Sequence, residues 1–249
     1  MCLMKTHLKV ITERYDNSKE RWMLNAEKPI VSVIIPAFKE GKTIREVIKE
    51  IKEATPFQTQ IIVVDGCSND GTEEIAKEEN VEMIAEPRRG YGRAIRTGLD
   101  HGNGDIIVII DADSTYEARD ISRLVSPLLK DEVDVCLASR ISGTILPGAM
   151  HGTNYVGNRV FTLLFNHLYR QKVSDTQTGF RAITKKALKS LELREDGMGI
   201  STAMLTQAAR KGLKIAEVPT TYKPRNNHSK SKLNRLEAGY DILRILLFG

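Results

Sequence analysis

Cysteine is scarce in this sequence, and its positions form no pattern. Cys2, Cys67 and Cys136 are the only three cysteines among the 249 residues. A disulfide framework or a zinc site needs paired or clustered thiols, and neither spacing occurs here. The sequence therefore predicts a protein of a reducing compartment, with Cys67 as a small and partly buried residue.

Long hydrophobic runs are absent as well. A complete transmembrane helix needs about 18 or more consecutive apolar residues, and no such run occurs. The first residues also lack the apolar segment of a signal peptide. The chain finishes on the apolar stretch YDILRILLFG (240–249), which predicts either an amphipathic helix or the beginning of a membrane anchor.

Acidic residues are slightly outnumbered, which leaves several kinds of partner open. Lys and Arg number 37 against 32 Asp and Glu, a formal net charge of +5. Nucleic acid, an anionic membrane surface and phosphorylated substrates all suit a mild basic excess. The basic stretch 223–235 has no Phe, Tyr or Trp on which bases could stack, so we expect no nucleic-acid partner.

The chain does contain short apolar runs rich in Val and Ile, at 30–35, 60–64, 81–85, 105–110 and 133–139. Segments of helical character lie between and after them, at 43–54, 72–80, 90–101 and 118–130. This alternation predicts an α/β fold with a doubly wound parallel sheet, whose ligand crevice lies at the carboxyl ends of the strands. Beyond residue 140 we expect helices at 154–170 and 201–211 and a strand at 213–218.

Three regions follow from this pattern. Residues 1–28 are expected to be an N-terminal extension, and 29–232 to be the α/β domain. Residues 233–249 are expected to be the amphipathic helix or the beginning of an anchor. A hydrophobic content of 41% and a charged content of 28% suit one such globular domain.

The segment after the first run resembles a phosphate-binding loop with one residue replaced. Pro36 is followed by Gly41, Lys42 and Thr43 at the spacing of that loop, but Pro36 stands where the first glycine belongs. Proline lacks the backbone N–H that such a loop directs at phosphate, and it fixes φ near −65°. A nucleoside-triphosphatase is therefore rejected.

Polar segments follow each of the first five apolar runs instead. They are 36–40, 63–72, 87–98, 111–113 and 139–140. Each is a weak signal alone, because glycines and acids also occur in ordinary turns. Since parallel strands end at one edge of a sheet, their joint placement predicts a single site there.

Three motifs make the pattern specific: DGCSNDGT (65–72), DAD (111–113) and TGFRA (178–182). With them, about residues 30–240 resemble the family-two inverting glycosyltransferases of GT-A fold, in particular dolichyl- and polyprenyl-phosphate mannose or glucose synthases. The resemblance implies a Rossmann-like fold with a mostly parallel sheet flanked by helices. The resemblance implies transfer of a hexose from UDP-glucose, UDP-N-acetylglucosamine or GDP-mannose to dolichyl or polyprenyl phosphate, with inversion, for protein or cell-surface glycosylation. A saccharide or other hydroxyl acceptor stays open as the alternative.

The resemblance also implies roles on the donor side. Asp111 and Asp113 would hold Mg²⁺ or Mn²⁺ through hard oxygen ligands. Binding of the nucleotide sugar is assigned to Pro36, Glu40, Asp65, Arg89, Asp111, Ala112 and Asp113. The chain departs from the family at three places: Lys39 replaces an Asn, Gly66 replaces a frequent second acid, and Thr115 replaces a Gln that often contacts the metal.

On the acceptor side, a phosphate monoester is already mostly a dianion at neutral pH and needs cations rather than a base. The resemblance assigns the acceptor phosphate to Ser139, Arg140, Arg159, Arg225 and Lys232. Asp175, beside Gln177, completes the catalytic set with Asp111 and Asp113. We expect Asp175 to organise the site, whereas a hydroxyl acceptor would make it a general base.

Two apolar segments bear on localisation, 155–169 and 236–248. Either could pack in the core. An exposed apolar helix flanked by Arg159, Arg170 and Lys172 would instead dock on anionic headgroups. We expect peripheral or anchored attachment to the cytoplasmic face of a membrane, and the sequence leaves the oligomeric state open.

Overall fold

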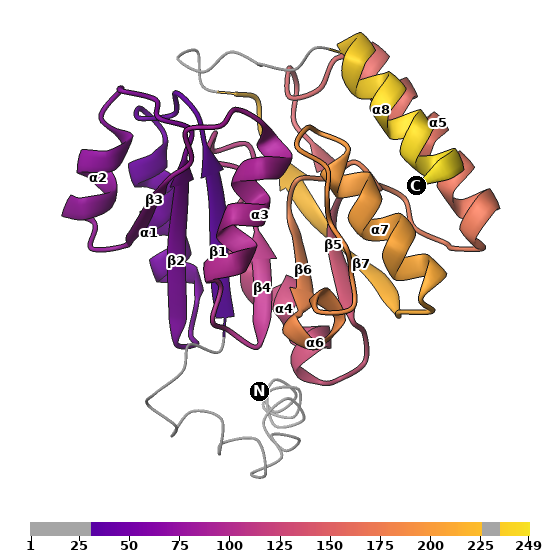
Figure 1. The fold of residues 1–249 in the computed structure, drawn as a ribbon, viewed down its shortest axis with the longest axis horizontal. Coiled ribbons are helices and arrows are strands. Elements are labelled where there is room, and N and C mark those ends of the chain that lie inside the picture. Colours follow the sequence, from indigo (N-terminus) through magenta and orange to yellow (C-terminus); the bar gives the residue numbers. More distant parts are fainter. Residues whose placement is uncertain (1–30, 226–234) are drawn as a thin grey trace, which may run out of the picture.

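A computed structural model describes residues 31–225 and 235–249, and its centre is one sheet with helices on both faces (Figure 1). The seven strands are ordered β3-β2-β1-β4-β6-β5-β7. Their bounds are β1 Val31–Ala37, β2 Thr59–Asp65, β3 Glu82–Ala85, β4 Ile106–Ile109, β5 Val135–Ile145, β6 Arg181–Thr184 and β7 Ile215–Tyr222. The α-helices are α1 Ile44–Ala54, α2 Thr72–Glu78, α3 Tyr91–His101, α4 Ile121–Leu129, α5 Gly152–Tyr169, α6 Lys185–Leu188, α7 Ile200–Arg210 and α8 Arg235–Phe248.

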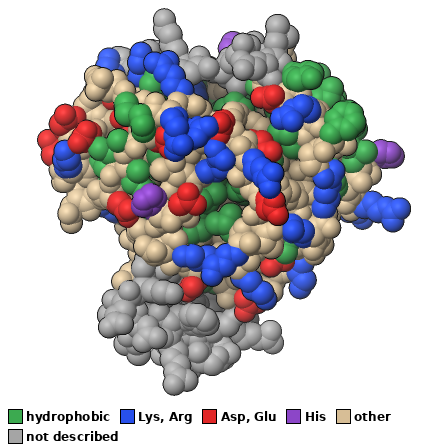
Figure 2. Space-filling model, viewed as in Figure 1, with side chains coloured by type: hydrophobic (Ala, Val, Ile, Leu, Met, Phe, Trp, Pro, Cys, Tyr) green, Lys and Arg blue, Asp and Glu red, His purple; other side chains and the backbone are tan. Residues whose placement is uncertain are grey.

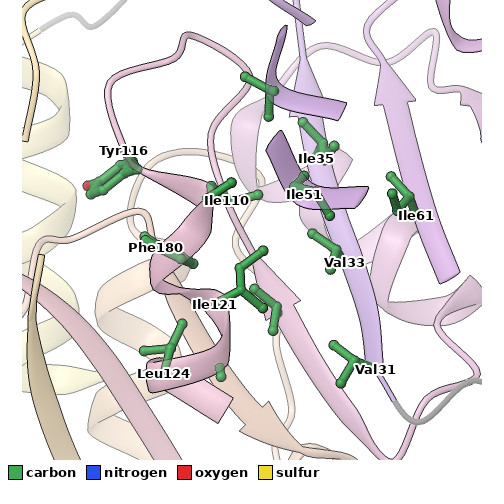
Figure 3. Close-up of a cluster of buried hydrophobic side chains, with 14 of the residues drawn as sticks. Val31, Val33, Ile35, Ile51, Ile61, Ile110, Tyr116, Ile121, Leu124 and Phe180 are labelled. Carbon is green, nitrogen blue, oxygen red and sulfur yellow. The ribbon is translucent and has the colours of Figure 1, made fainter. Parts of the chain in front are cut away.

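The central strands bury side chains on both faces, because apolar residues occupy successive positions. In β1, Val33 and Ile35 join the cluster beneath α1 and α4, while Ile34 joins the cluster beneath α3 and α7. Figure 3 shows the first cluster, in which Val33 and Ile35 lie near Ile51 of α1. Burial of each such side chain contributes about 1.5–3 kcal/mol. The continuous apolar runs are thus explained by two-sided burial.

The parallel part of the sheet places the ends of its strands together. β1 pairs in parallel with β2 and with β4, and Ala37 lies opposite Asp65 at the carboxyl end. Asp65 is the last residue of β2, and Asp111 lies two residues beyond the last residue of β4. The predicted α/β fold and its mostly parallel sheet are confirmed for this part.

One strand of this mostly parallel sheet runs in the opposite direction. β6 lies between β4 and β5 and is antiparallel to both. Its four residues are RAIT, of which the first two belong to the TGFRA segment, and no strand was predicted there. So short a strand carries too little periodicity to be recognised in a sequence. It nevertheless brings the TGF turn beside the end of β4.

One further prediction needs correction at β5. Ser139 and Arg140 lie inside this 11-residue strand rather than at its end. The pairing of β5 with β7 changes register between Ser139 and Thr144, so the strand continues past an irregularity. An irregularity of this kind bends a strand and increases its local twist.

α5 and α8 contact one another and cover the end of the sheet near β5 and β7 (Figure 1). α8 buries Ile242, Ile245 and Leu246, whereas α5 buries only Thr162 and Phe165. Within the described residues, no helix is long and apolar enough to cross a membrane.

Candidate active site

The centre of the site is the turn that follows β4. Asp113 is 3% exposed, and its Oδ1 accepts hydrogen bonds from the backbone N–H of Thr115 (3.1 Å) and its hydroxyl (2.6 Å). The turn is tied to α1 because the Thr43 hydroxyl donates to the Ala112 carbonyl oxygen at 2.7 Å. Thr115, at the family's Gln position, therefore orients the Asp113 carboxylate.

Arg225 joins two acids from different strands. Its Nη2 lies 2.5 Å from Asp113 Oδ2, and its Nη1 lies 3.7 Å from Glu40 Oε1. The chain reaches this position because the Lys223 N–H donates to the Thr115 carbonyl oxygen at 2.8 Å, just beyond β7. Glu40 is 7% exposed and follows β1. Two predicted donor residues and one predicted acceptor residue thus meet in one cluster.

Asp111 is held by two contacts that sequence reasoning missed. The Tyr91 hydroxyl donates to Asp111 Oδ1 at 2.8 Å. On the other side, a Cβ added to Gly179 would come within 2.3 Å of Asp111 Oδ2, so only glycine fits there. Burial, followed by the nearby Asp113 charge, raises the pKa of Asp111 to about 6. The position of this carboxylate is therefore closely defined.

The glycines around Tyr91 explain its placement. A Cβ on Gly90 would lie 2.3 Å from the Asp196 carbonyl oxygen, and one on Gly92 would lie 2.4 Å from that of Glu195. Gly90 also has a φ of 141°, a conformation that favours glycine. These glycines let the start of α3 pack against the loop at 195–197, which leaves Tyr91 directed at Asp111. The GYG spacing is the only sequence signal that pointed to this residue.

Arg181 is a buried cation close to Tyr91 and Asp111. It is 1% exposed, and its guanidinium donates to the carbonyl oxygens of Ser201, at 2.8 Å, and Thr178. Within residues 31–225 and 235–249, no carboxylate forms an ion pair with Arg181. Its charge is thus satisfied by carbonyl dipoles beneath the TGF turn.

The end of β2 supplies a second acidic position. Asp65 is 5% exposed, and both of its oxygens accept from Ser68: the backbone N–H at 2.9 Å and the hydroxyl at shorter range. Pro36 lies inside β1, opposite Val64. Cys67 is exposed, which corrects the prediction of partial burial. Its φ of 55° in the turn after β2 accounts for this outward placement.

Arg89 and Lys39 lie over one aromatic ring at the rim. The Arg89 guanidinium is 5.2 Å and the Lys39 ammonium 5.5 Å from the centroid of Phe38. The Lys39 N–H donates to the Ser68 hydroxyl at 2.8 Å, which joins the ends of β1 and β2. Cations at the rim beside the Asp65 turn suit a negatively charged ligand.

Arg140 and Asp175 form a buried, two-pronged ion pair. Arg140 Nε and Nη2 donate to the two Asp175 oxygens at 2.7 and 2.8 Å, and the Arg140 backbone N–H donates at 3.1 Å. Asp175 is fully buried, and its Oδ1 also accepts from the Gln177 N–H at 3.2 Å. The guanidinium lies 5.2 Å from the centroid of the Tyr222 ring. A carboxylate so occupied is suited to positioning Arg140.

Of the remaining predicted acceptor residues, the two that the structure describes lie on different elements, β5 and α5. Ser139 is fully buried, and its hydroxyl contacts the Ser174 hydroxyl at 2.6 Å and accepts from the Ser142 N–H at 3.0 Å. Arg159 is exposed on α5. Lys232 lies outside the described residues. The roles of these three in binding an acceptor stay predictions.

The residues at the β4 turn fit a divalent cation that arrives with a diphosphate. No group of three or more His, Cys, Asp or Glu side chains in the described part of the chain forms a ready metal site. Mg²⁺ and Mn²⁺ at phosphate sites commonly use one or two carboxylates together with phosphate oxygens and water. Asp111 and Asp113 supply that number of hard ligands, and Arg225 already places a positive charge against Asp113.

Comparisons with known proteins all find similarity to glycosyltransferases. Residues 32–192 match the family model described as glycosyl transferase family 2. "Glycosyltransferase AglJ" of Haloferax volcanii is 33% identical, with 84% of this chain and 68% of the relative covered. The chain covers 57% of the length of a second relative from the same organism. A "dolichyl-phosphate hexose transferase" of Haloferax volcanii is 31% identical, with 80% of this chain and 86% of the relative covered. A "UDP-N-acetylglucosamine--dolichyl-phosphate N-acetylglucosaminyltransferase" of Methanococcus voltae is 30% identical, with 88% and 95% covered.

Among solved structures, the chain is similar to glucosyl-3-phosphoglycerate synthase of Mycobacterium tuberculosis in complex with Mn²⁺, UDP-glucose and phosphoglyceric acid. The TM-score is 0.72 at 26% identity, and 88% of this chain and 79% of that one are covered.

Proposed function

The chain belongs to glycosyltransferase family 2, and on that premise we propose that it transfers a hexose from a nucleoside-diphosphate sugar to dolichyl or another polyprenyl phosphate, with inversion. The finer parts of this proposal are the donor, the acceptor and the stereochemistry. UDP-glucose, UDP-N-acetylglucosamine and GDP-mannose are the candidate donors. Relatives whose names specify dolichyl phosphate support the choice of acceptor.

The observation that carries the proposal is the cluster in which Asp111 and Asp113 adjoin Arg225 and Glu40. It lies where the strands of the parallel half end, the usual ligand position of such sheets. Carboxylates for a cation and a cation for a phosphate stand together there, which suits a diphosphate leaving group next to a phosphate nucleophile.

In the proposed reaction, an oxygen of the acceptor phosphate attacks the anomeric carbon of the sugar. The bond from that carbon to the diphosphate oxygen breaks, and its electron pair leaves with the nucleoside diphosphate. Asp111 and Asp113 would hold Mg²⁺ or Mn²⁺, which would supply positive charge to neutralise the leaving diphosphate. Asp65, Pro36, Glu40 and Arg89 would surround the nucleotide.

The environment of Asp175 favours a phosphate over a hydroxyl acceptor. A general base must reach the proton that it removes, whereas Asp175 is fully buried and bound to Arg140 through both oxygens. A phosphate dianion carries no such proton and requires neighbouring cations. Arg140 and Arg225 are the described cations that we assign to this task, and Asp175 would position Arg140.

We place the lipid acceptor on the side of α5 and α8. Val156, Val160 and Leu163 are 54–61% exposed and recur on one face of α5. On α8, Tyr240, Leu243 and Leu247 recur in the same way and are 41–69% exposed. Figure 2 shows hydrophobic side chains gathered over the region that holds α8 in Figure 1. Arg159 lies on α5, and Arg170 and Lys172 follow it. This arrangement supports peripheral docking on an anionic leaflet, which we propose to be cytoplasmic.

A donor screen tests the proposal directly. The purified full chain would be incubated with Mg²⁺ or Mn²⁺, a short polyprenyl phosphate and each nucleotide sugar in turn, and lipid-linked sugar would be detected by mass. We expect one donor to yield product that disappears with EDTA and in the Asp113→Ala variant.

Donor hydrolysis or binding without any lipid-linked product, across the whole panel, would reject the lipid-phosphate acceptor. A saccharide or other hydroxyl acceptor would then take its place. If the unmodified chain bound none of the nucleotide sugars, the donor assignment would be contradicted as well.

A further inference from the structure

A basic groove lies along α3, outside the acidic cluster of the active site. It has a volume of about 560 Å³ and runs between α3, the segment just before it, and the segment from α6 to residue 193. Five cationic side chains line it against a single acid, Asp100: Arg88, Arg93, Arg96, Lys185 and Lys189. Figure 2 shows basic side chains around a hollow on the face that carries α3.

The groove also has an apolar wall. Leu99 of α3 faces Leu188, Leu191 and Leu193 from the segment around α6. Its volume lies within the range of small-molecule sites, about 300–1,000 Å³. A flat basic surface would suit a membrane or a long nucleic acid, whereas a groove with an apolar wall suits a small molecule that has a charged end.

Part of the positive charge is already balanced, and the remainder is not. Asp196 pairs with both Arg93 and Arg96, and Glu86 pairs with Arg88 at 2.8 Å. Lys185 donates to the Gly102 carbonyl oxygen at 2.8 Å, and among the described residues no carboxylate pairs with Lys185 or Lys189. Arg96 Nε has no hydrogen-bond partner in the part of the chain described. The groove therefore holds excess positive charge, and one buried arginine nitrogen at its wall has no partner among the described residues.

We propose that this groove binds a small organic phosphate, a phosphate group attached to an apolar or planar body, at a site separate from the transfer reaction. The phosphate would lie among the lysines and arginines, since such donors form charge-assisted hydrogen bonds with its oxygens. The organic part would lie against the leucines. The proposal is independent of which sugar or acceptor the enzyme uses.

Methyl NMR of the full chain tests this proposal, with leucine methyl groups as local probes. The Asp113→Ala variant in EDTA suppresses metal-dependent binding at the donor site. Phenyl phosphate and inorganic phosphate serve as the probe ligands. We expect saturable shifts at Leu99, Leu188, Leu191 and Leu193 and none at Leu128, which is buried under the opposite face. Phenyl phosphate should bind at least about threefold more tightly than inorganic phosphate, because the ring buries apolar area.

Two charge reversals on neighbouring residues provide the control. Lys189→Glu changes the groove, whereas Lys186→Glu makes the same change of net charge at an exposed residue outside it. Lys189→Glu should weaken binding about tenfold or more, and Lys186→Glu less than about twofold. Both are surface changes, and the spectra themselves report whether each variant is folded.

Three results would overturn the proposal: no shifts at the groove leucines, equal weakening by both reversals, or inorganic phosphate binding as tightly as phenyl phosphate. None of them bears on lipid-linked product in the donor screen, so this site and the proposed transfer reaction succeed or fail separately.

Discussion

Tyr91 illustrates how a single side chain defines the geometry of the candidate active site. Its hydroxyl holds one oxygen of Asp111 at 2.8 Å while Gly179 closes the space beside the other. Asp111 is expected to contact the donor, so Tyr91 acts through it as a positioning residue. A carboxylate fixed before the substrate arrives does not have to be reoriented during the reaction.

Replacing Tyr91 by Phe removes this hydrogen bond and retains the ring. A hydrogen bond to a charged group contributes about 1.5–3 kcal/mol, so we expect kcat to fall about ten- to a hundredfold. Steady-state kinetics of the transfer, with thermal unfolding as the check on folding, measure the effect. Tyr155→Phe on the exposed part of α5 is the matched control, and an unchanged kcat in Tyr91→Phe would contradict the positioning role.

The Arg140–Asp175 pair distinguishes two roles of one carboxylate. Asp175→Asn weakens the partner of a buried guanidinium, and breaking such a pair costs about 3–5 kcal/mol. We expect a lower free energy of unfolding in urea together with reduced but measurable turnover. Combining Asp175→Asn with Arg140→Met should recover part of the lost stability, because no buried charge then lacks its partner. A stable Asp175→Asn variant without any turnover would indicate a general base instead.

At the scale of elements, Glu86 connects the end of β3 to α3. Its carboxylate accepts from Arg88 at 2.8 and 2.9 Å and from the Thr97 hydroxyl of α3 at 2.6 Å. These hydrogen bonds, Arg88 first and Thr97 second, lower the pKa of Glu86 from 4.5 to about 2. One carboxylate thereby fixes the element that carries Tyr91 and forms a wall of the basic groove.

This pKa shift predicts how stability depends on pH. A carboxyl whose pKa is lowered on folding stabilises the native state above its unfolded pKa and loses that contribution as pH falls through its folded pKa. The stability advantage of the unmodified chain over Glu86→Gln should therefore be full above about pH 5 and vanish towards pH 2. Urea unfolding across this range measures it. Glu53→Gln, an exposed change on α1, should show no such trend.

At the scale of the whole molecule, the proposed catalytic site and the proposed docking surface lie on adjoining parts of the structure. The acidic cluster lies at the strand ends, and the exposed apolar faces belong to α5 and α8 beside β5 and β7. Exposed apolar patches of this kind mark interaction surfaces. A nucleotide sugar from solution and a phosphate from a bilayer can approach such a molecule from different sides.

Membrane docking can be tested by changing the exposed face of α5. Val160→Glu with Leu163→Glu replaces two apolar side chains, each worth about 1.5–3 kcal/mol when buried. We expect binding to vesicles of phosphatidylcholine and phosphatidylglycerol to fall at least about tenfold in a sedimentation assay. Leu129→Glu, at the end of α4, is the control for an exposed leucine elsewhere. Equal binding by all three proteins would contradict docking through α5.

The sequence by itself determined the alternation of strands and helices, the strand ends that carry Asp65 and Asp111, and the family. These features depend on short segments of sequence, because runs buried on both faces and turns rich in glycine are recognisable within about ten residues. The tertiary structure alone decided that β6 enters between β4 and β5 in the opposite direction. It also decided that Tyr91 holds Asp111, that Asp175 holds Arg140, and that Arg225 reaches Asp113. Each of these contacts joins segments far apart in the chain, and side-chain hydrogen bonds between such segments leave no periodic signal in the sequence.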